Sequence, residues 1–453
     1  MDGAAYHSDA ASCELPADVL LLVVEASLPE WRGVLRHVGR PWRDAVAKVE
    51  AAELGGGASP MRMAEIAGWL ALLEWAAVQG CPMTKRTCAI VVSRGGLESL
   101  RWCREQAGCP WDATACAAAA AAGDLASLRY CREHGCTWGP DTPAAAAGGG
   151  HLDALRFALE HDCPRDESTC AAAAREGRLD ALQVAREAGC PWGATTCAAA
   201  ARGGHLPLLR WARESGCEWD GATCSQAAAG GHLSVLRWAR EGGCHVNTDT
   251  CAAAAASGDL PLLRWCLEQG LLHDRNTCAG AASAGLASLQ AARQAGCTWD
   301  WKTTAAAAAA GHLDALEWAV AEGCPLIKTV AAEAAAAGQL PALVWLRGAG
   351  CPWDAGTTAA AAGGGHLAVL RWAVERGCEV TSLAAARAAA GGHLAVLRWA
   401  ASSGCLEWDV RTAANAAGGG HAKLLEWAVE HGCPWGPATC SRAAEGGHLA
   451  ILQ

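Results

Sequence analysis

Apolar residues recur in this chain in blocks of about 27 residues, and each block contains two short segments with helical spacing. In residues 196–223 an alanine-rich segment comes first and ends at two glycines. The second segment carries Leu, Leu, Trp and Ala on one side and Arg, Arg and Glu on the other. Because apolar positions three and four residues apart share one face of a helix, each block predicts two helices joined by a tight turn.

One leucine marks the start of the second segment in almost every block. It lies at Leu70, Leu97, Leu125, Leu152, Leu179, Leu206, Leu233, Leu260, Leu286, Leu313, Leu340, Leu367, Leu394 and Leu449, with Ala422 in the same register. This gives 15 copies, the last of them incomplete. A unit this small buries its apolar face only by stacking on its neighbours. The sequence therefore predicts an all-α solenoid of helix–turn–helix repeats over residues 61–453.

Polar residues and glycines predict where the helices of one repeat begin and end. We expect Thr196 to cap the first helix, because its hydroxyl can accept a hydrogen bond from a free backbone N–H group. Gly203 and Gly204 end this helix and allow a turn with positive φ. Pro207 suits only the first turn of the second helix, and we expect Gly216 just after its end.

Composition and charge narrow the classes of partner. The net charge of −10, without clustered lysine or arginine, argues against a nucleic-acid backbone as the partner. The first residues lack the pattern of a secretory signal, and the apolar run at 19–24 is too short to span a bilayer. We therefore expect a monomer in the cytoplasm or nucleus, with protein partners, no nucleic acid and no membrane.

The 25 cysteines follow the repeat. Thirteen close a repeat, and eight stand at the start of a helix, seven of them directly after a threonine. The preferred interpretation is a small core residue in a reducing compartment. Zinc and disulfides are the alternatives, but no repeat offers the four ligands of a structural zinc site, and Leu271 replaces one cysteine of a recurring pair. We expect no metal, no cofactor and no disulfide.

Histidine also recurs, directly before the marker leucine of many repeats. No acid or nucleophile accompanies it, so we interpret it as a turn residue that bonds to backbone across repeats. No glycine-rich phosphate loop follows a strand. The sequence therefore predicts no catalytic residue and no enzyme. The recurring histidines are His151, His205, His232, His312, His366, His393, His421 and His448.

Tryptophan occurs 22 times, in two main sets. One set lies in the second helix and is predicted to be core: Trp211, Trp238, Trp265, Trp372 and Trp399. The other set lies in the turns between repeats and is predicted to be partly exposed: Trp111, Trp192, Trp219, Trp353 and Trp435. These turn residues either form a recognition surface or fold over the turn and seal the stack, and we favour the second alternative.

The repeated unit resembles an ankyrin repeat. The shared residues are the A-A-x-x-G-H-L core and a pair of glycines, Gly204 and Gly216. The period is shorter than the family's usual period of about 33 residues. The missing residues fall between Asp220 and Thr223. The resemblance implies an ankyrin-like α-solenoid with short turns where ankyrin repeats have projecting hairpins.

Residues 15–50 differ from the repeats and resemble an F-box. Leu-Pro, an acid and an aliphatic run, followed by Leu-Arg-x-Val-x-Arg-x-Trp-Arg, carry the resemblance, whereas Gly39 and Pro41 depart from the family's pattern. The resemblance implies a small helical domain that binds the linker subunit of a cullin–RING ubiquitin ligase. The residues it assigns to that contact are Leu15, Pro16, Val19, Leu20 and Trp42.

Together these features predict a tail at 1–14, an F-box-like domain at 15–50, a linker at 51–60 and the repeat array at 61–453. The function expected is a protein-interaction scaffold that recruits a substrate protein to the ligase. The alternative is a structural or sequestering repeat protein whose N-terminal helices only cap the array. The substrate protein cannot be named, because the first helices are nearly all alanine.

Overall fold

The computed structural model describes residues 83–405 and 407–448, together with Leu70, Leu73, Glu74, Ala77 and Ile451. In this part of the chain every regular element is a helix, and the helices follow each other in pairs. The prediction of an all-α helical-repeat solenoid is therefore confirmed. The predicted domains at 1–14, 15–50 and 51–60 lie outside the described residues.

The chain forms two compact units, Met1–Thr196 and Cys197–Gln453. In the first unit α6 runs across a kink at Gly96, where two helices join. Its helices are α6 (Lys85–Glu105), α7 (Ala113–Ala122), α8 (Leu125–Glu133), α9 (Asp141–Gly149), α10 (Leu152–Glu160), α11 (Glu167–Arg175) and α12 (Leu179–Glu187), and α13 (Ala194–Arg202) contains the boundary.

The second unit continues the same alternation. Its helices are α14 (Leu206–Glu214), α15 (Gly221–Ala229), α16 (Leu233–Glu241), α17 (Thr248–Ala256), α18 (Leu260–Glu268), α19 (Arg275–Ala284), α20 (Leu286–Gln294), α21 (Trp301–Ala310), α22 (Leu313–Ala321), α23 (Lys328–Ala336), α24 (Leu340–Gly348), α25 (Ala355–Gly363), α26 (Leu367–Glu375), α27 (Ser382–Ala390), α28 (Leu394–Ser402), α29 (Val410–Gly418), α30 (Ala422–Glu430) and α31 (Pro437–Glu445). From α8 onward, each even-numbered helix begins at the residue in the marker register, which confirms the predicted repeat.

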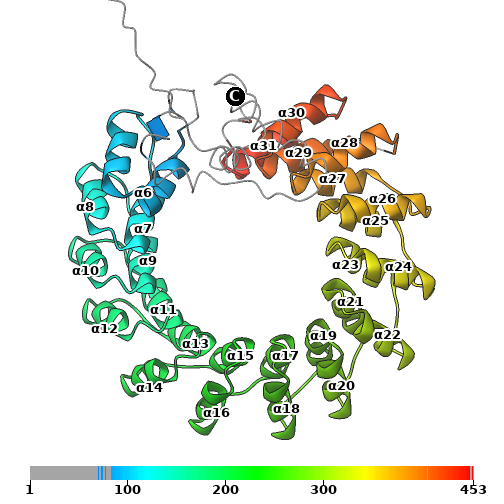
Figure 1. Ribbon diagram of the computed structural model, residues 1–453, viewed down its shortest axis with the longest axis horizontal. Helices are drawn as coiled ribbons and strands as arrows, with labels where there is room; N and C mark the ends of the chain where they lie inside the picture. The colour runs from blue at the N-terminus through cyan, green and yellow to red at the C-terminus, as the bar shows by residue number, and fades with distance from the viewer. Residues whose placement is uncertain are drawn as a thin grey trace, which may run out of the picture. The chain divides into compact units, whose positions relative to one another are not determined.

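Within each unit the odd-numbered helices lie side by side in one layer, and the even-numbered helices lie in a second layer (Figure 1). Alanine allows the odd-numbered helices to approach closely. One close approach is seen at Gly280 in α19, where an added Cβ would lie 2.7 Å from the Ala252 carbonyl oxygen of α17. Buried leucines and alanines of both layers form the core between them, among them Leu236, Leu263 and Ala281.

Aspartate, and not threonine, caps most of the odd-numbered helices. Asp220 caps α15 and accepts a hydrogen bond from the Ala222 backbone N–H group. Thr223 lies inside the first turn and is fully buried. The prediction that Thr196 caps its helix is wrong for the same reason, since α13 begins at Ala194 and Thr196 is buried inside it. Where an aspartate stands three residues earlier, as Asp220 does before Thr223, its carboxylate reaches the free N–H groups more easily than a hydroxyl that the core has covered.

The turn between the two helices of a repeat depends on glycine and histidine. The His232 Nε2 atom lies 3.0 Å from the Arg202 carbonyl oxygen of the preceding repeat. Gly204 has a φ of 76°, and an added Cβ there would lie 2.7 Å from the His232 ring. His151, His393, His421 and His448 make the same bond to Ala121, Gly363, Ala390 and Gly418. The interpretation of the recurring histidine as a bond across repeats is confirmed at these positions.

Among the described residues, no helix has the length and apolar character needed to cross a lipid bilayer.

Candidate binding surface on the even-numbered helices

The even-numbered helices carry arginines in their last turn that stack on the tryptophan of the following turn. The guanidinium of Arg213 lies 4.2 Å from the ring centre of Trp219 and also donates to the Cys217 carbonyl oxygen. A cation over an indole face is attracted by its electrons, so the contact fixes the turn. The same contact joins Arg104 to Trp111, Arg132 to Trp138, Arg186 to Trp192, Arg293 to Trp299 and Arg347 to Trp353.

A second set of arginines joins neighbouring repeats. Arg210 of α14 lies 5.8 Å from the ring centre of Trp238 in α16. Arg237 and Arg371 make the same contact with Trp265 and Trp399. All five second-helix tryptophans are half-buried, so their prediction as core residues is wrong. Leucine and alanine fill the core. Each of these tryptophans directly follows an exposed arginine and lies at the edge of the core. The residues concerned are Trp211, Trp238, Trp265, Trp372 and Trp399.

The five turn tryptophans have two different environments. Four are half-buried under an arginine: Trp111, Trp192, Trp219 and Trp353. Trp219 also meets the Trp238 ring edge to face, with the ring centres 5.4 Å apart. Trp435, in contrast, is 63% exposed. Packing of this kind favours a role in sealing the stack for the four, and their use as a recognition surface stays a prediction.

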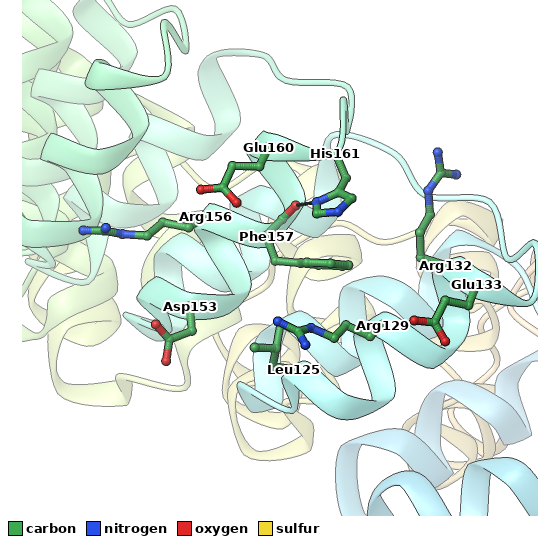
Figure 2. Close-up of a pocket in the computed structure, with 9 residues that line it drawn as sticks. All are labelled: Leu125, Arg129, Arg132, Glu133, Asp153, Arg156, Phe157, Glu160 and His161. Carbon is green, nitrogen blue, oxygen red and sulfur yellow. Dashed lines mark hydrogen bonds between the residues drawn. The ribbon is translucent and has the colours of Figure 1, made fainter.

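A groove of about 690 Å³ opens between α8 and α10 in the first unit. Figure 2 shows the Phe157 ring pointing from α10 toward α8, with His161 on one side and Arg129 on the other. Three arginines and three acidic residues surround this ring, so both charge signs meet in one small space. The lining residues are Leu125, Arg129, Arg132, Glu133, Asp153, Arg156, Phe157, Glu160 and His161.

Phe157 stands in the register that tryptophan occupies in most repeats, and it is the only phenylalanine of the chain. The Trp138 ring meets it edge to face, with the ring centres 6.2 Å apart. The Arg129 guanidinium lies 5.5 Å from its ring centre. A phenyl ring is smaller than the indole that most repeats have in this register.

His161 lies at one rim of the groove, and Asp162 follows it in the register where most repeats have glycine. The His161 ring lies 4.2 Å from the Phe157 ring centre, and its Nδ1 atom lies 2.9 Å from the Phe157 carbonyl oxygen. Asp162 has a φ of 57° and is the one non-glycine residue with positive φ in the described part of the chain. Aspartate tolerates this conformation better than most residues, at a cost that glycine would avoid.

The closing cysteines of the repeats bond to backbone, which gives them a packing role. The Cys244 thiol donates to the Asp220 carbonyl oxygen at 3.1 Å and so ties the end of the repeat to its start. The same bond recurs at Cys109, Cys136, Cys163, Cys324, Cys351 and Cys378. In the described part of the chain the cysteines carry free thiols, and nearly all of them are buried.

One repeat brings three thiols together. Cys116 lies on α7, Cys131 on α8 and Cys136 in the turn after α8, and their Sγ atoms lie within 4.8 Å of one another. All three are buried. Hydrogen bonds with the Cys116 and Cys131 thiols lower the pKa of Cys136, although burial acts in the opposite direction. Within the residues that the structure describes, this is the one close group of three metal-ligating side chains.

Sequence reasoning missed both the groove and the thiol cluster. The signals were present as departures from the repeat: Phe157 in place of tryptophan, and Cys131 in the register of Ala212 and Ala239. The F-box-like residues Leu15, Pro16, Val19, Leu20 and Trp42 lie outside the described residues. Their role stays a prediction.

No protein-family model and no curated protein matches this chain. Among solved structures, the pentatricopeptide repeat protein PPR10 in complex with an 18-nt psaJ RNA element is 16% identical, with a TM-score of 0.33 over 96% of this chain and 78% of that one. A cysteine-substituted form in complex with the same element gives the same values. The protein from maize is 17% identical, with a TM-score of 0.30 over 96% and 76%. These proteins share helical repeats with this chain, and ankyrin membership stays a prediction.

The expectation that nucleic acid is excluded as a partner is wrong. Two of these structures contain a helical-repeat protein together with RNA. The exclusion rested on net charge, which averages over the whole surface, whereas a bound partner meets only the local charge of one face. Net charge therefore leaves the class of partner open.

Proposed function

We propose that this chain is a binding scaffold, and that the groove between α8 and α10 receives a segment of a protein partner. The observation that carries this proposal is the groove of about 690 Å³ around Phe157, in a register where most repeats have tryptophan. Repeat arrays of this kind bind through extended surfaces and not through catalytic side chains. We therefore propose a binding role and no enzymatic one.

The lining of the groove indicates what kind of segment would fit. An aliphatic or aromatic side chain of the partner would pack on Phe157 and Leu125, which supply the apolar part. Arg129, Arg156 and Glu133 lie around that contact and would pair with charges of the opposite sign. Aromatic and arginine side chains are the residues that most often carry binding energy in protein interfaces.

A protein segment suits the groove better than an RNA backbone because acidic groups share the space with the arginines. Asp153, Glu133 and Glu160 would all face a phosphate chain laid along the groove, and like charges repel. A protein segment can offer both signs and match them. RNA is nevertheless retained as an outcome of the test.

Site-specific photo-crosslinking of the full chain tests the proposal. A photoreactive amino acid is placed at Glu133 in the groove, or at Glu214, which has the same position in α14 and is also exposed. We expect one protein to be crosslinked from Glu133 and not from Glu214. The captured protein is then purified, and its direct binding to the chain is measured.

Crosslinking from Glu133 and from Glu214 distinguishes the possible binding sites and partners. Equal capture of the same protein from Glu133 and Glu214 would show that the groove is not the site. RNA recovered from Glu133, with no protein that binds after purification, would replace the protein partner by a nucleic acid. Failure of the purified protein to bind the chain would contradict the proposal as well.

We also propose that the repeats are ankyrin-like and that residues 15–50 connect the scaffold to a cullin–RING ligase. The support is the pattern that begins at Leu15 and Pro16 and ends at Trp42 and Arg43. Leu20→Glu should abolish binding of the ligase linker subunit, because a charge would enter the apolar contact, while the melting of the repeats stays unchanged. If the unaltered chain binds no linker subunit in a direct assay, the ligase role is excluded and the scaffold remains.

A further inference from the structure

We propose that Cys116, Cys131 and Cys136 bind one Cu(I) ion inside the first unit. Their sulfur atoms lie within 4.8 Å of one another, on two helices and the turn that follows. Cys116 and Cys131 are 0% exposed and Cys136 is 1% exposed, so water has no access to the sulfur atoms. Three sulfur ligands in a dry, enclosed space suit a soft ion of low coordination number.

The register of the repeats explains why the cluster forms here. Cys131 stands where Ala212 and Ala239 stand in other repeats, so it adds a third thiol to a pair that recurs along the chain. The repeat at 251–271 has the first two cysteines, Cys251 and Cys266, but Leu271 replaces the third. The repeat at 88–109 has all three, but its turn between Cys103 and Cys109 is one residue longer.

The ligand set favours Cu(I) over zinc. Thiolate ligands select soft ions, and structural zinc is almost always held by four ligands. The cluster offers three side chains among the described residues, and its burial keeps bulk water from the sulfur atoms. The expectation of no metal was based on the lack of four ligands per repeat, a requirement that Cu(I) does not have.

Binding needs no co-reactant. Each Cu–S bond that forms replaces an S–H bond, whose proton leaves to the solvent, and copper stays in the +1 state. The bound ion would join α7, α8 and the following turn. Because α8 also carries Arg129, Arg132 and Glu133, the ion would fix one wall of the groove, but the copper site does not depend on what the groove binds.

The test is an anaerobic titration of the reduced, metal-free full chain with Cu(I) in the presence of the competing chelator bicinchoninate. Other cysteine pairs can also take copper, so the variants are compared with the unaltered chain. We expect Cys131→Ala and Cys136→Leu each to remove one equivalent of bound Cu(I), or to weaken that equivalent at least tenfold. Both substitutions use residues that other repeats place in the same registers, which favours folding.

Cys244→Leu is the matched control, since it alters the closing cysteine of a repeat that has only two. The Cys244→Leu variant should still bind the equivalent of Cu(I) that the Cys131→Ala variant loses. X-ray absorption should show three sulfur neighbours per copper for this equivalent. Equal copper content in the unaltered chain and in both cluster variants would overturn the proposal, and so would two sulfur neighbours. Stoichiometric zinc that is lost in Cys131→Ala would show that the ion is wrong.

Discussion

The surface between α8 and α10 and the surface between α14 and α16 have the same register but different side chains. On α16, Trp238 meets the Trp219 ring, and Gly242 lies so close to Trp219 that an added Cβ would be 2.7 Å from that ring. Two indoles therefore pack against each other on this surface. On α10 the corresponding residues are Phe157 and His161, and a groove remains.

The comparison shows that the repeated residues form the scaffold. Residues that depart from the repeat give single surfaces a different shape and chemistry. The histidine bond, the aspartate cap and the closing cysteine recur in both units and concern stability. Phe157, Asp162 and Cys131 each break the pattern, and they lie on neighbouring elements of one unit. A site on a repetitive array is therefore best sought where the repeat fails.

The largest effect should come from adding a methyl group at the turn before α16. Gly230→Ala would place Cβ 2.4 Å from the Arg202 carbonyl oxygen, which is a backbone atom and cannot move aside. We therefore expect the free energy of unfolding to fall by about 3 kcal/mol. Gly149→Ala, at the turn before α10, is the matched change and should cost less. Its Cβ would lie 3.2 Å from the Ala121 carbonyl oxygen, although it also meets the His151 ring. Chemical denaturation measures both, and equal losses would contradict the packing described.

The next largest effect concerns binding. Phe157→Trp would fill the groove with the residue that most repeats have in this register, so affinity for the crosslinked partner should fall about 30-fold, or about 2 kcal/mol. Trp238→Phe is the reciprocal control and should leave that affinity unchanged. Isothermal titration gives both values. An unchanged affinity in Phe157→Trp would remove the groove from the interface.

A smaller effect should be the same on both surfaces. His151→Ala and His232→Ala each remove a bond of 3.0 Å to a carbonyl oxygen of the preceding repeat. A hydrogen bond of this kind contributes about 1 kcal/mol, so both variants should lose about that much stability. Thermal and urea unfolding would show it. A loss confined to one of the two would mean that the bond is not a shared element of the scaffold.

The smallest effect is a pH dependence that both units share. Hydrogen bonding to the Thr114 hydroxyl holds the pKa of Asp112 below its usual 3.8, and hydrogen bonding to Lys328 does so for Asp354. A folded pKa below the unfolded one gives stability above about pH 4 that is lost as the pH falls through the folded value. Asp112→Asn and Asp354→Asn should each reduce the fall in the free energy of unfolding between pH 5 and pH 2. The same fall in both variants as in the unaltered chain would show that these two carboxylates do not cause the pH dependence.

Much of the fold could be predicted from the sequence because its period is strict. The start of α14 at Leu206 and the glycine after its end at Gly216 follow from single residues with few conformational choices. The cap was misassigned to Thr196 because threonine is a good capping residue, and only the start of α13 at Ala194 shows that Thr196 lies inside the helix. That start depends on packing in three dimensions.

The candidate site was harder to predict because it rests on volumes and distances. Phe157 and Trp238 are equally aromatic in a sequence, and only the structure shows that one leaves a groove. The approach of Cys131 to Cys116 and Cys136 depends on the length of a turn, as the repeat with Cys103 and Cys109 shows.

Hydrogen–deuterium exchange of the full chain with and without the crosslinked partner tests most directly whether the groove is the binding site. Backbone amides become protected where a partner covers an element or restricts its opening. We predict new protection in α8 and α10, at residues 125–133 and 152–161, and no change in α14 and α16, at residues 206–214 and 233–241. Protection of α14 and α16 with α8 and α10 unchanged would contradict the account.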